Sequence, residues 1–526
     1  MSSLPAKQSP FAWAMILVLL GTVLHLVLGF TTELSVDEAH YALYADRIAW
    51  SYFDHPPLVG WIQWPLVAID ASDGILRLIP IVLWILSCFL VYQLGYQFSE
   101  YCKTQKLFKN SFNPIASSLA GLLSVVVVAF APLPHVLAVG LVPDSLLTPL
   151  SLGIMWLAFC WIKQDGKYSV WQWLALSLLF GLAGLSKYTA VLYAIAFLVV
   201  LLTVSRLTFI KQSGFYVAVF TAFVLISPVL LWNASHDWIS FKYQIDHGGG
   251  GTWEWRRVAA FIGLQIGVFG FLPLLGTLAY FRSMNIFAPP RVSILLTFFV
   301  VPFLVFTALS GGGGLPHWTM PAWFCLAPFA GIGLAAWWEQ GKRWFIALFM
   351  AIQGTLVLIG LTLVFTAGYP IAQQFKANPL ADLYGFRTAS HRANLLVNEL
   401  KASGIAVQNW TLASRVAWYA RPTSVYVLDD RYDQFDLWFG SLPEGSNVIL
   451  LNWSQMSFKA PVGEGQFRSC RALDRLTIAR MGEPLSRFEL SYCQGWGGKA
   501  KPEREALSRS EEHTSELQSP CNLVCR

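Results

Sequence analysis

Long apolar runs dominate the chain between residues 11 and 368. A helix crosses a bilayer with about 20 mostly apolar residues, and roughly eleven runs approach or reach this length. They lie near residues 11–30, 75–97, 114–132, 146–162, 170–186, 189–205, 214–232, 258–281, 292–309, 320–338 and 344–368. We therefore predict a mainly α-helical, polytopic membrane protein with about eleven transmembrane helices. The first run exceeds the apolar core of a signal peptide, so we expect a retained helix.

The pattern changes after Gly368-Tyr369-Pro370. The following residues are polar enough to fold in water, and they combine a helical pattern (Ser390 to Ser403) with strand patterns at Thr423 to Leu428 and Asn447 to Leu451. We predict a transmembrane domain over 1–370 and a small soluble α/β domain over 371–508. Cys470 and Cys493 lie in the second domain. They are either free or joined by a disulfide, which an oxidising compartment would favour.

The distribution of Lys and Arg predicts the orientation. The loops on one side hold most of these residues, whereas the other side's short loops hold few, among them Lys187, Arg256 and Arg257. The positive-inside rule places the richer side and the N-terminus in the cytoplasm. An odd number of spans then places the C-terminal domain outside, which is the periplasm for a bacterial inner-membrane protein.

Composition excludes two classes of protein. With 55% hydrophobic and 13% charged residues and a mean hydropathy of +0.52, the chain is too apolar for a soluble protein of 526 residues. The net charge of +6 is modest and forms no basic stripe, so we expect no nucleic-acid partner.

The end of the chain has a different origin. The segment RSEEHTSELQS, which starts at Arg509, is what a sequencing adapter encodes when it is translated. We interpret 509–526 as a non-native tail and infer no function from it.

Two adjacent acids, Asp37 and Glu38, directly follow the first apolar run. Carboxylates beside a bilayer are costly unless they face a wet cavity, so they are candidates for a functional site. One could accept a proton from a hydroxyl nucleophile while the other orients it or holds a metal. The alternative is that Asp37 caps a helix that begins at Ala39. Asp144, after Pro143, is a candidate ligand for a divalent metal or, alternatively, a helix cap.

Basic residues are predicted on the same face of the membrane. Lys187 stands alone between two apolar runs, where it either binds a phosphate or extends to the interface as a structural lysine. His55, Arg256 and His317 are further candidates for binding a phosphate. Acids for a hydroxyl and bases for a phosphate fit the transfer of a sugar from a lipid phosphate, because nucleotide sugars are confined to the cytoplasm. The lipid phosphate would leave stabilised by cations.

Four segments resemble the family 39 glycosyltransferases, which have the GT-C fold and include protein O-mannosyltransferases, the lipid A aminoarabinose transferase and lipopolysaccharide galacturonosyl transferases. The segments are VDEAHY, YFDHPPLVGW, GLAGLSKYTAVL and PHWTMPAW, within a similarity over about residues 10–370. RYDQFDLW, from Arg431, resembles the family's outer domain. Sugar identity stays open, and the acceptor is a glycolipid such as lipid A, a lipopolysaccharide core, another glycan or a protein.

The resemblance implies a polyprenyl-phosphate-linked sugar as donor, an inverting reaction and Asp37 as the catalytic base. Lys187 matches a lysine of the family, and His55 takes a position where relatives often carry Lys. That histidine and the short interval between Asp37 and Asp54 argue against the aminoarabinose transferase itself. Metal use stays open, since some members bind a divalent metal and others need none.

Two other classes of protein are alternatives to a transferase. A flippase for a lipid-linked sugar would show repeat symmetry and charges near the midplane, whereas here the charges gather at one face. An envelope scaffold would leave the acids and bases without a role.

Overall fold

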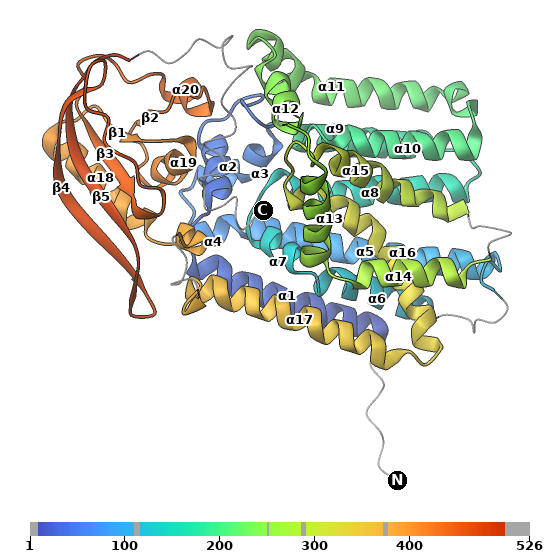
Figure 1. The fold of residues 1–526 in the computed structure, drawn as a ribbon. Helices are drawn as coiled ribbons and strands as arrows, with labels where there is room; N and C mark the ends of the chain where they lie inside the picture. Colours follow the sequence, from blue (N-terminus) through green and yellow to red (C-terminus); the bar gives the residue numbers. More distant parts are fainter. Residues whose placement is uncertain (1–8, 110–115, 250–251, 286–290, 372–376, 500–526) are drawn as a thin grey trace.

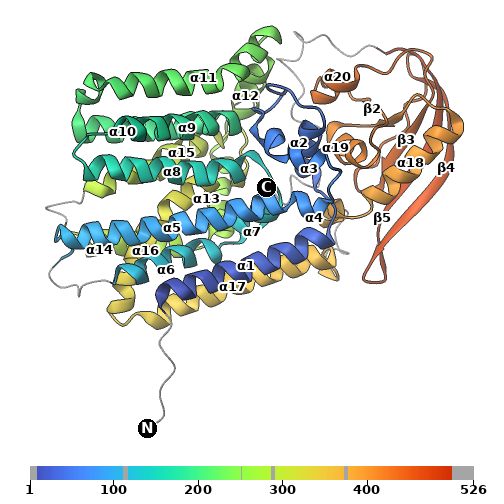
Figure 2. The ribbon, with the colours of Figure 1, turned by 180° about the vertical axis from the view of Figure 1, so that it is seen from behind.

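The computed structural model describes residues 9–109, 116–249, 252–285, 291–371 and 377–499. A bundle of roughly parallel helices forms one part, and an α/β domain lies beyond one end of it (Figure 1, Figure 2). The predicted fold class is confirmed. The bundle contains α1 (Pro10–Thr31), α5 (Leu78–Thr104), α6 (Ser117–Ala129), α7 (Pro132–Val139), α8 (Pro143–Lys163), α9 (Val170–Ser186), α10 (Ala190–Ser205), α11 (Ser213–Ser235), α13 (Trp255–Phe269), α14 (Leu272–Ser283), α15 (Thr297–Leu309), α16 (Met320–Glu339) and α17 (Arg343–Thr366).

Among the described residues, eight helical stretches are long and apolar enough to cross a membrane, or up to ten if each of two bent helix pairs is one span. The pairs are α6 with α7, bent by 75°, and α13 with α14, bent by 91°. Each of the roughly eleven predicted runs contains a helix, but α9 has only 17 residues. The second break follows from Gly270, whose φ of +80° ends α13, and from Pro273, which lacks an N–H and starts α14.

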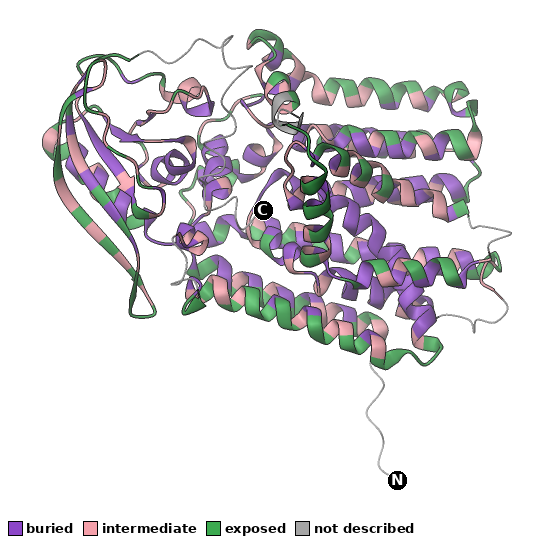
Figure 3. Cartoon of the chain, in the orientation of Figure 1, coloured by how far each residue is buried: buried purple, intermediate pink, exposed green. Residues whose placement is uncertain are grey.

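Helix α16 forms the centre of the bundle, and its apolar window is completely buried. It contacts α5, α6, α8 and α14. Small residues permit this packing: a Cβ on Gly333 would collide with the backbone of Gly276 on α14. By contrast, α1, α11 and α17 are peripheral, with apolar residues exposed along their outer sides (Figure 3). In a membrane protein such surfaces face lipid.

Four short helices cover the end of the bundle that faces the α/β domain (Figure 1). They are α2 (Val36–Asp46), α3 (Leu58–Val67), α4 (Asp73–Leu76) and α12 (Ile239–Gly249). Short 3-10 helices lie between the other elements. They are η1 (Thr208–Lys211), η2 (Arg291–Leu296), η3 (Pro316–Thr319), η5 (Pro379–Leu383) and η6 (Ser454–Met456).

The α/β domain has a five-stranded sheet of order β2-β1-β3-β5-β4. Strand β1 is parallel to β2 and β3, whereas β5 is antiparallel to β3 and β4. The strands are β1 (Ile405–Val407), β2 (Val425–Val427), β3 (Val448–Trp453), β4 (Phe467–Arg480) and β5 (Glu483–Trp496), and the helices are α18 (Phe386–Leu400), α19 (Trp410–Tyr419) and α20 (Gln434–Phe439). The helix and both strands expected in this region are therefore confirmed.

Cys470 and Cys493 face each other across β4 and β5 and form a disulfide. Of the two alternatives left open by the sequence, the disulfide is confirmed. The interpreted tail, 509–526, lies outside the described residues.

The α/β domain packs directly on the short helices, because α19 contacts α2 over much of its length. Polar contacts add to this packing. Arg387 and Tyr419 each bind Asp73 of α4, at 2.5 and 2.7 Å. The backbone N–H of Phe53 donates to Gln434 Oε1 at 2.7 Å, so α20 holds the loop before α3.

Candidate functional site

The acidic pair lies in the first turn of α2. Ser35 is the N-cap, and its backbone N–H donates to Glu38 Oε2 at 3.0 Å. The expectation that Asp37 caps a helix beginning at Ala39 is therefore wrong, because the helix starts at Val36. Carboxylates in a first turn are favoured by the helix dipole, which offsets part of the cost of gathering them here.

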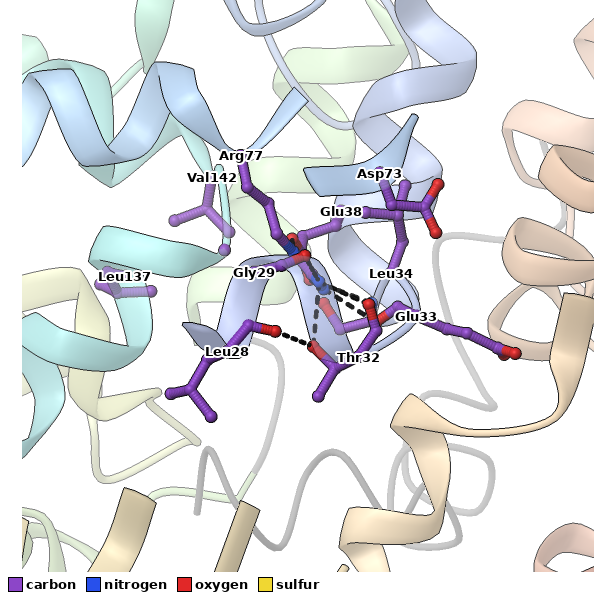
Figure 4. Close-up of polar contacts among 12 residues, drawn as sticks. Leu28, Gly29, Thr32, Glu33, Leu34, Glu38, Asp73, Arg77, Leu137 and Val142 are labelled. Carbon is purple, nitrogen blue, oxygen red and sulfur yellow. Dashed lines mark hydrogen bonds and ion pairs between the residues drawn. The ribbon is translucent and has the colours of Figure 1, made fainter. Parts of the chain in front are cut away.

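Glu38 is engaged by Arg77, whose side chain is buried (Figure 4). Arg77 Nε and Nη2 donate to the two carboxylate oxygens at 2.6 and 2.9 Å. The same guanidinium also donates to the carbonyl oxygens of Gly29, Thr32 and Glu33, at 3.0, 2.7 and 2.8 Å. A buried charge pair is stable only when its hydrogen bonds are satisfied, and this one fixes the end of α1 against α2.

Asp37 has a different environment from its neighbour. Its side chain is partly exposed, and no hydrogen bond or ion pair to it is found among the described residues. Burial, with the charges of Asp54 and Glu38, raises the pKa of Asp37 to about 6, although the charges of His40 and Arg415 oppose the rise. At neutral pH the carboxylate is ionised, yet it is more basic than an ordinary Asp. These are the properties of a general base.

A second acid, Asp54, lies close to Asp37. Tyr44 donates its hydroxyl hydrogen to Asp54 Oδ1, and His40 Nε2 lies 3.6 Å from the same oxygen. Burial alone would raise the pKa of Asp54, but His40, His55 and the Tyr44 hydroxyl together hold it well below its usual range. Asp54 is therefore a fixed negative charge, unlike Asp37.

Asp144 and Lys187 form a buried ion pair. Lys187 Nζ donates to both carboxylate oxygens of Asp144, at 2.8 and 2.7 Å, and His317 Nε2 lies 3.9 Å from Asp144 Oδ2. Asp144 is in the first turn of α8, whose N-cap is Val142, so the expectation that Asp144 is a helix cap is wrong. The expectation of a snorkelling Lys187 is also wrong, because its side chain is buried.

A divalent metal at Asp144 would compete with this ammonium group for the same oxygens. The described residues contain no group of three or more His, Cys, Asp or Glu that could hold a metal ion. The donor set that they offer therefore fits a lysine-neutralised carboxylate better than a metal centre.

His55 lies between the two clusters. Burial and the Lys187 charge lower the pKa of His55 to about 4, although the Asp54 charge opposes them. The ring is thus neutral at physiological pH. Its buried Nδ1 has no hydrogen-bond partner within the part of the chain that the structure describes. His55 can therefore meet a phosphate as a hydrogen-bond donor rather than as a charge.

Tyr41 connects these acids in space. Burial raises the pKa of Tyr41 well above its ordinary value, and the charges of Asp37, Asp54 and Asp144 raise it further, so all three charges act on one buried hydroxyl. Arg256 is not part of the same cluster. Its side chain is exposed in the first turn of α13, and no contact with the other candidates is found among the described residues.

An apolar cavity of about 520 Å³ lies between α9, α10 and α11. Trp173, Phe180 and Phe197 line it, and Tyr188 and Phe241 belong to its wall at the end near the acids. Tyr188 follows Lys187 in the chain, and its hydroxyl lies 3.4 Å from that of Ser51. The cavity therefore extends along these three helices toward the charged cluster.

Comparisons with known proteins agree with this architecture. A family model described as dolichyl-phosphate-mannose-protein mannosyltransferase matches residues 54–232. The lipid A galacturonosyltransferase RgtD of Rhizobium johnstonii is 25% identical over 359 residues, which cover 64% of this chain and 69% of that protein. The resemblance to glycosyltransferase family 39 is confirmed. Together these similarities indicate that the chain is a membrane glycosyltransferase.

Solved structures establish the fold of this glycosyltransferase. ArnT from Cupriavidus metallidurans bound to undecaprenyl phosphate superposes with a TM-score of 0.60 and 14% identity, covering 91% of this chain and 98% of ArnT. The apo form gives the same TM-score and 15% identity. The fold is GT-C, as the sequence predicted.

Sequence reasoning missed Arg77 and His40. Arg77 stands at the start of an apolar run, where a buried arginine needs an acid, and this was an available signal for its pairing with Glu38. His40 follows Asp37 by three residues, a spacing that places both on one face of a helix.

Proposed function

We propose that the protein is an inverting glycosyltransferase that moves one sugar from a polyprenyl-phosphate donor to an envelope acceptor at the periplasmic face of the bacterial inner membrane. One observation carries this proposal. Asp37, a carboxylate with a raised pKa and no bound partner among the described residues, lies in the same cluster as the Lys187–Asp144 pair. A base and a phosphate-binding cation are thus available in one site.

The reaction needs a base for the acceptor. Asp37 removes the proton from the acceptor hydroxyl as the oxygen attacks the anomeric carbon. The bond from that carbon to the phosphate oxygen breaks, and the polyprenyl phosphate leaves with the electron pair. Attack opposite to the leaving group inverts the anomeric configuration. Glu38 assists by position, because its pairing with Arg77 fixes the helix that carries Asp37.

The leaving phosphate needs donors. The Lys187 ammonium group has three hydrogens. Two of them are donated to the carboxylate oxygens of Asp144, so the third remains for a phosphate oxygen. His55 offers a neutral N–H, and His317, beside Asp144, is a further donor. Arg256, exposed in the first turn of α13, has no part in this proposal.

A polyprenyl chain needs an apolar environment. The cavity between α9, α10 and α11 supplies one, and its Tyr188 wall adjoins Lys187 in the chain. We assign this cavity to the first isoprene units of the donor. The acceptor class is a glycolipid such as lipid A or a lipopolysaccharide core, and the lipid A name of RgtD supports that choice. The Cys470–Cys493 disulfide supports an oxidising compartment for the α/β domain.

Purified protein in lipid nanodiscs tests this function directly. It is mixed with a set of polyprenyl-phosphate sugars and with lipid A or core glycolipid, and released polyprenyl phosphate is measured by mass spectrometry. We expect acceptor-dependent release with one of the donors and none with the Asp37→Asn variant. Equal release by both proteins would remove Asp37 from the mechanism. If none of the donors gives acceptor-dependent release, the proposed function is contradicted.

A further inference from the structure

His40 is buried at the boundary between α2 and the α/β domain. Its ring is surrounded by Trp410 of α19 and by Phe435 and Trp438 of α20, with ring centroids 5.5, 6.0 and 5.8 Å away. These aromatic side chains all come from the α/β domain and shield His40 from water. A histidine in such a place needs specific partners for both ring nitrogens.

The hydrogen bonds of Ser414 determine what Nδ1 carries. The Ser414 hydroxyl has one hydrogen, which it donates to the carbonyl oxygen of Trp410 at 2.8 Å. Its oxygen lies 3.2 Å from His40 Nδ1 and is left to act as the acceptor. The Nδ1 atom therefore carries a hydrogen and donates it to Ser414.

The other nitrogen, Nε2, faces a carboxylate. It lies 3.6 Å from Asp54 Oδ1, which already accepts the Tyr44 hydroxyl hydrogen. A lone pair on Nε2 would repel this oxygen, whereas an N–H is attracted to it. Both ring nitrogens of His40 therefore face an oxygen that can accept a hydrogen.

We propose that His40 is a positioning residue for sugar transfer, a cation held by Ser414 of the α/β domain that keeps Asp37 and Asp54 ionised together. This role rests on the proposed function, because it concerns the base of that reaction. His40 follows Asp37 by one helical turn, so its charge acts on both acids. The α/β domain then contributes to the reaction through Ser414 and through the aromatic side chains that shield His40.

The charged and titratable groups around His40 come from several elements. Helix α2 itself supplies Asp37, Tyr41 and Tyr44, the following loop supplies Asp54 and His55, and α19 supplies Arg415. Arg415 is already paired with Asp382, so its charge is largely compensated. The contacts found with α20 are aromatic. Without His40, two acids would share a poorly solvated site, and one would hold a proton at neutral pH.

Carbodiimide labelling tests this role without relying on catalysis. Dicyclohexylcarbodiimide modifies protonated carboxyl groups, and the full-length protein in nanodiscs is labelled between pH 5 and pH 8. The fraction of modified Asp37 is measured by peptide mass spectrometry. The variants are His40→Gln and Ser414→Ala, and the matched control is His391→Gln, an exposed histidine of α18.

We expect the midpoint of Asp37 labelling to rise by about one pH unit in His40→Gln, as removal of a nearby opposite charge predicts, by less in Ser414→Ala, and not at all in His391→Gln. The acidic limb of the transfer rate should move with it. An unchanged midpoint in His40→Gln overturns the inference, as does one in Ser414→Ala if His40→Gln does not fold. A shifted midpoint in a protein that transfers no sugar would contradict the proposed function alone.

Discussion

Arg77 donates to both carboxylate oxygens of Glu38, at 2.6 and 2.9 Å, and is buried with it beneath the first turn of α2. The pair divides the two adjacent acids into different roles. Glu38 is saturated by Arg77 and by the backbone N–H of Ser35, whereas Asp37 keeps its carboxylate available. Glu38 therefore has a structural role, which is to fix the helix turn that carries Asp37, the proposed base.

Breaking this ion pair should reduce stability. Glu38→Gln leaves the Arg77 charge buried without its partner, so we expect a loss of about 3 kcal/mol in the free energy of unfolding. Thermal unfolding in detergent measures it. The control is Asp474→Asn, which breaks the solvent-accessible pair with Arg392 and should cost much less, because surface ion pairs contribute little to stability. If both variants lose the same free energy of unfolding, the buried Glu38–Arg77 pair contributes no more to stability than a surface pair, and the prediction is wrong.

The pH dependence of transfer should follow Asp37. Its pKa is raised to about 6, mainly by burial, and the base works only when deprotonated. Activity should therefore fall as the pH drops through about 6, rather than through about 4 as for an ordinary Asp. The rate of transfer at low donor concentration, measured from pH 4.5 to 8, checks this. A flat profile down to pH 5 would contradict the assignment.

Lys187 should matter for donor binding. Replacing it with Met removes the cation and leaves the buried Asp144 carboxylate unpaired, which repels a phosphate. We expect the KM for the polyprenyl-phosphate donor to rise about tenfold or more, since a charge-assisted hydrogen bond contributes about 1.5–3 kcal/mol. The matched control is Lys242→Met, an exposed lysine of α12. An unchanged KM in Lys187→Met would exclude Lys187 from the phosphate site.

The disulfide offers a test of orientation and stability. Cys470→Ser with Cys493→Ser should destabilise the α/β domain by about 2–4 kcal/mol, measured by limited proteolysis of the full chain. The paired control is Cys88→Ser, a buried free cysteine in α5.

In intact cells, a membrane-impermeant thiol reagent should modify the α/β domain only after reduction. Labelling that requires permeabilised cells would place the domain in the cytoplasm.

Much of the transmembrane part is predictable because hydrophobicity is a local property. Every apolar run contains a helix in the structure, and the acids and bases meet at one end because the helices alternate in direction. The bends are harder to predict, since Gly270 and Pro273 interrupt a run that remains apolar throughout. Counting each bent pair as one span gives up to ten spans among the described residues, and the remaining predicted span corresponds to α9, which has only 17 residues.

The site is only partly predictable for a different reason. Asp144, in α8, and Lys187, just after α9, are 43 residues apart, and each is recognisable in the sequence as a charge in an apolar setting. Their pairing depends on tertiary structure. The contact of Ser414 with His40 joins residues that are 374 apart and belong to two domains, so no local sequence pattern predicts it.

The most direct test of the central claim uses mass spectrometry of lipid A and core oligosaccharide from bacteria that lack this gene. The cells are complemented with the wild-type protein, with Asp37→Asn, or with the control Asp46→Asn from the far end of α2. We predict that one sugar-sized mass increment is lost on deletion and restored by the wild type and by Asp46→Asn. Asp37→Asn should restore less than about one hundredth of it, the loss expected for a missing general base. Full restoration by Asp37→Asn, or an unchanged glycolipid profile in all strains, would contradict the account.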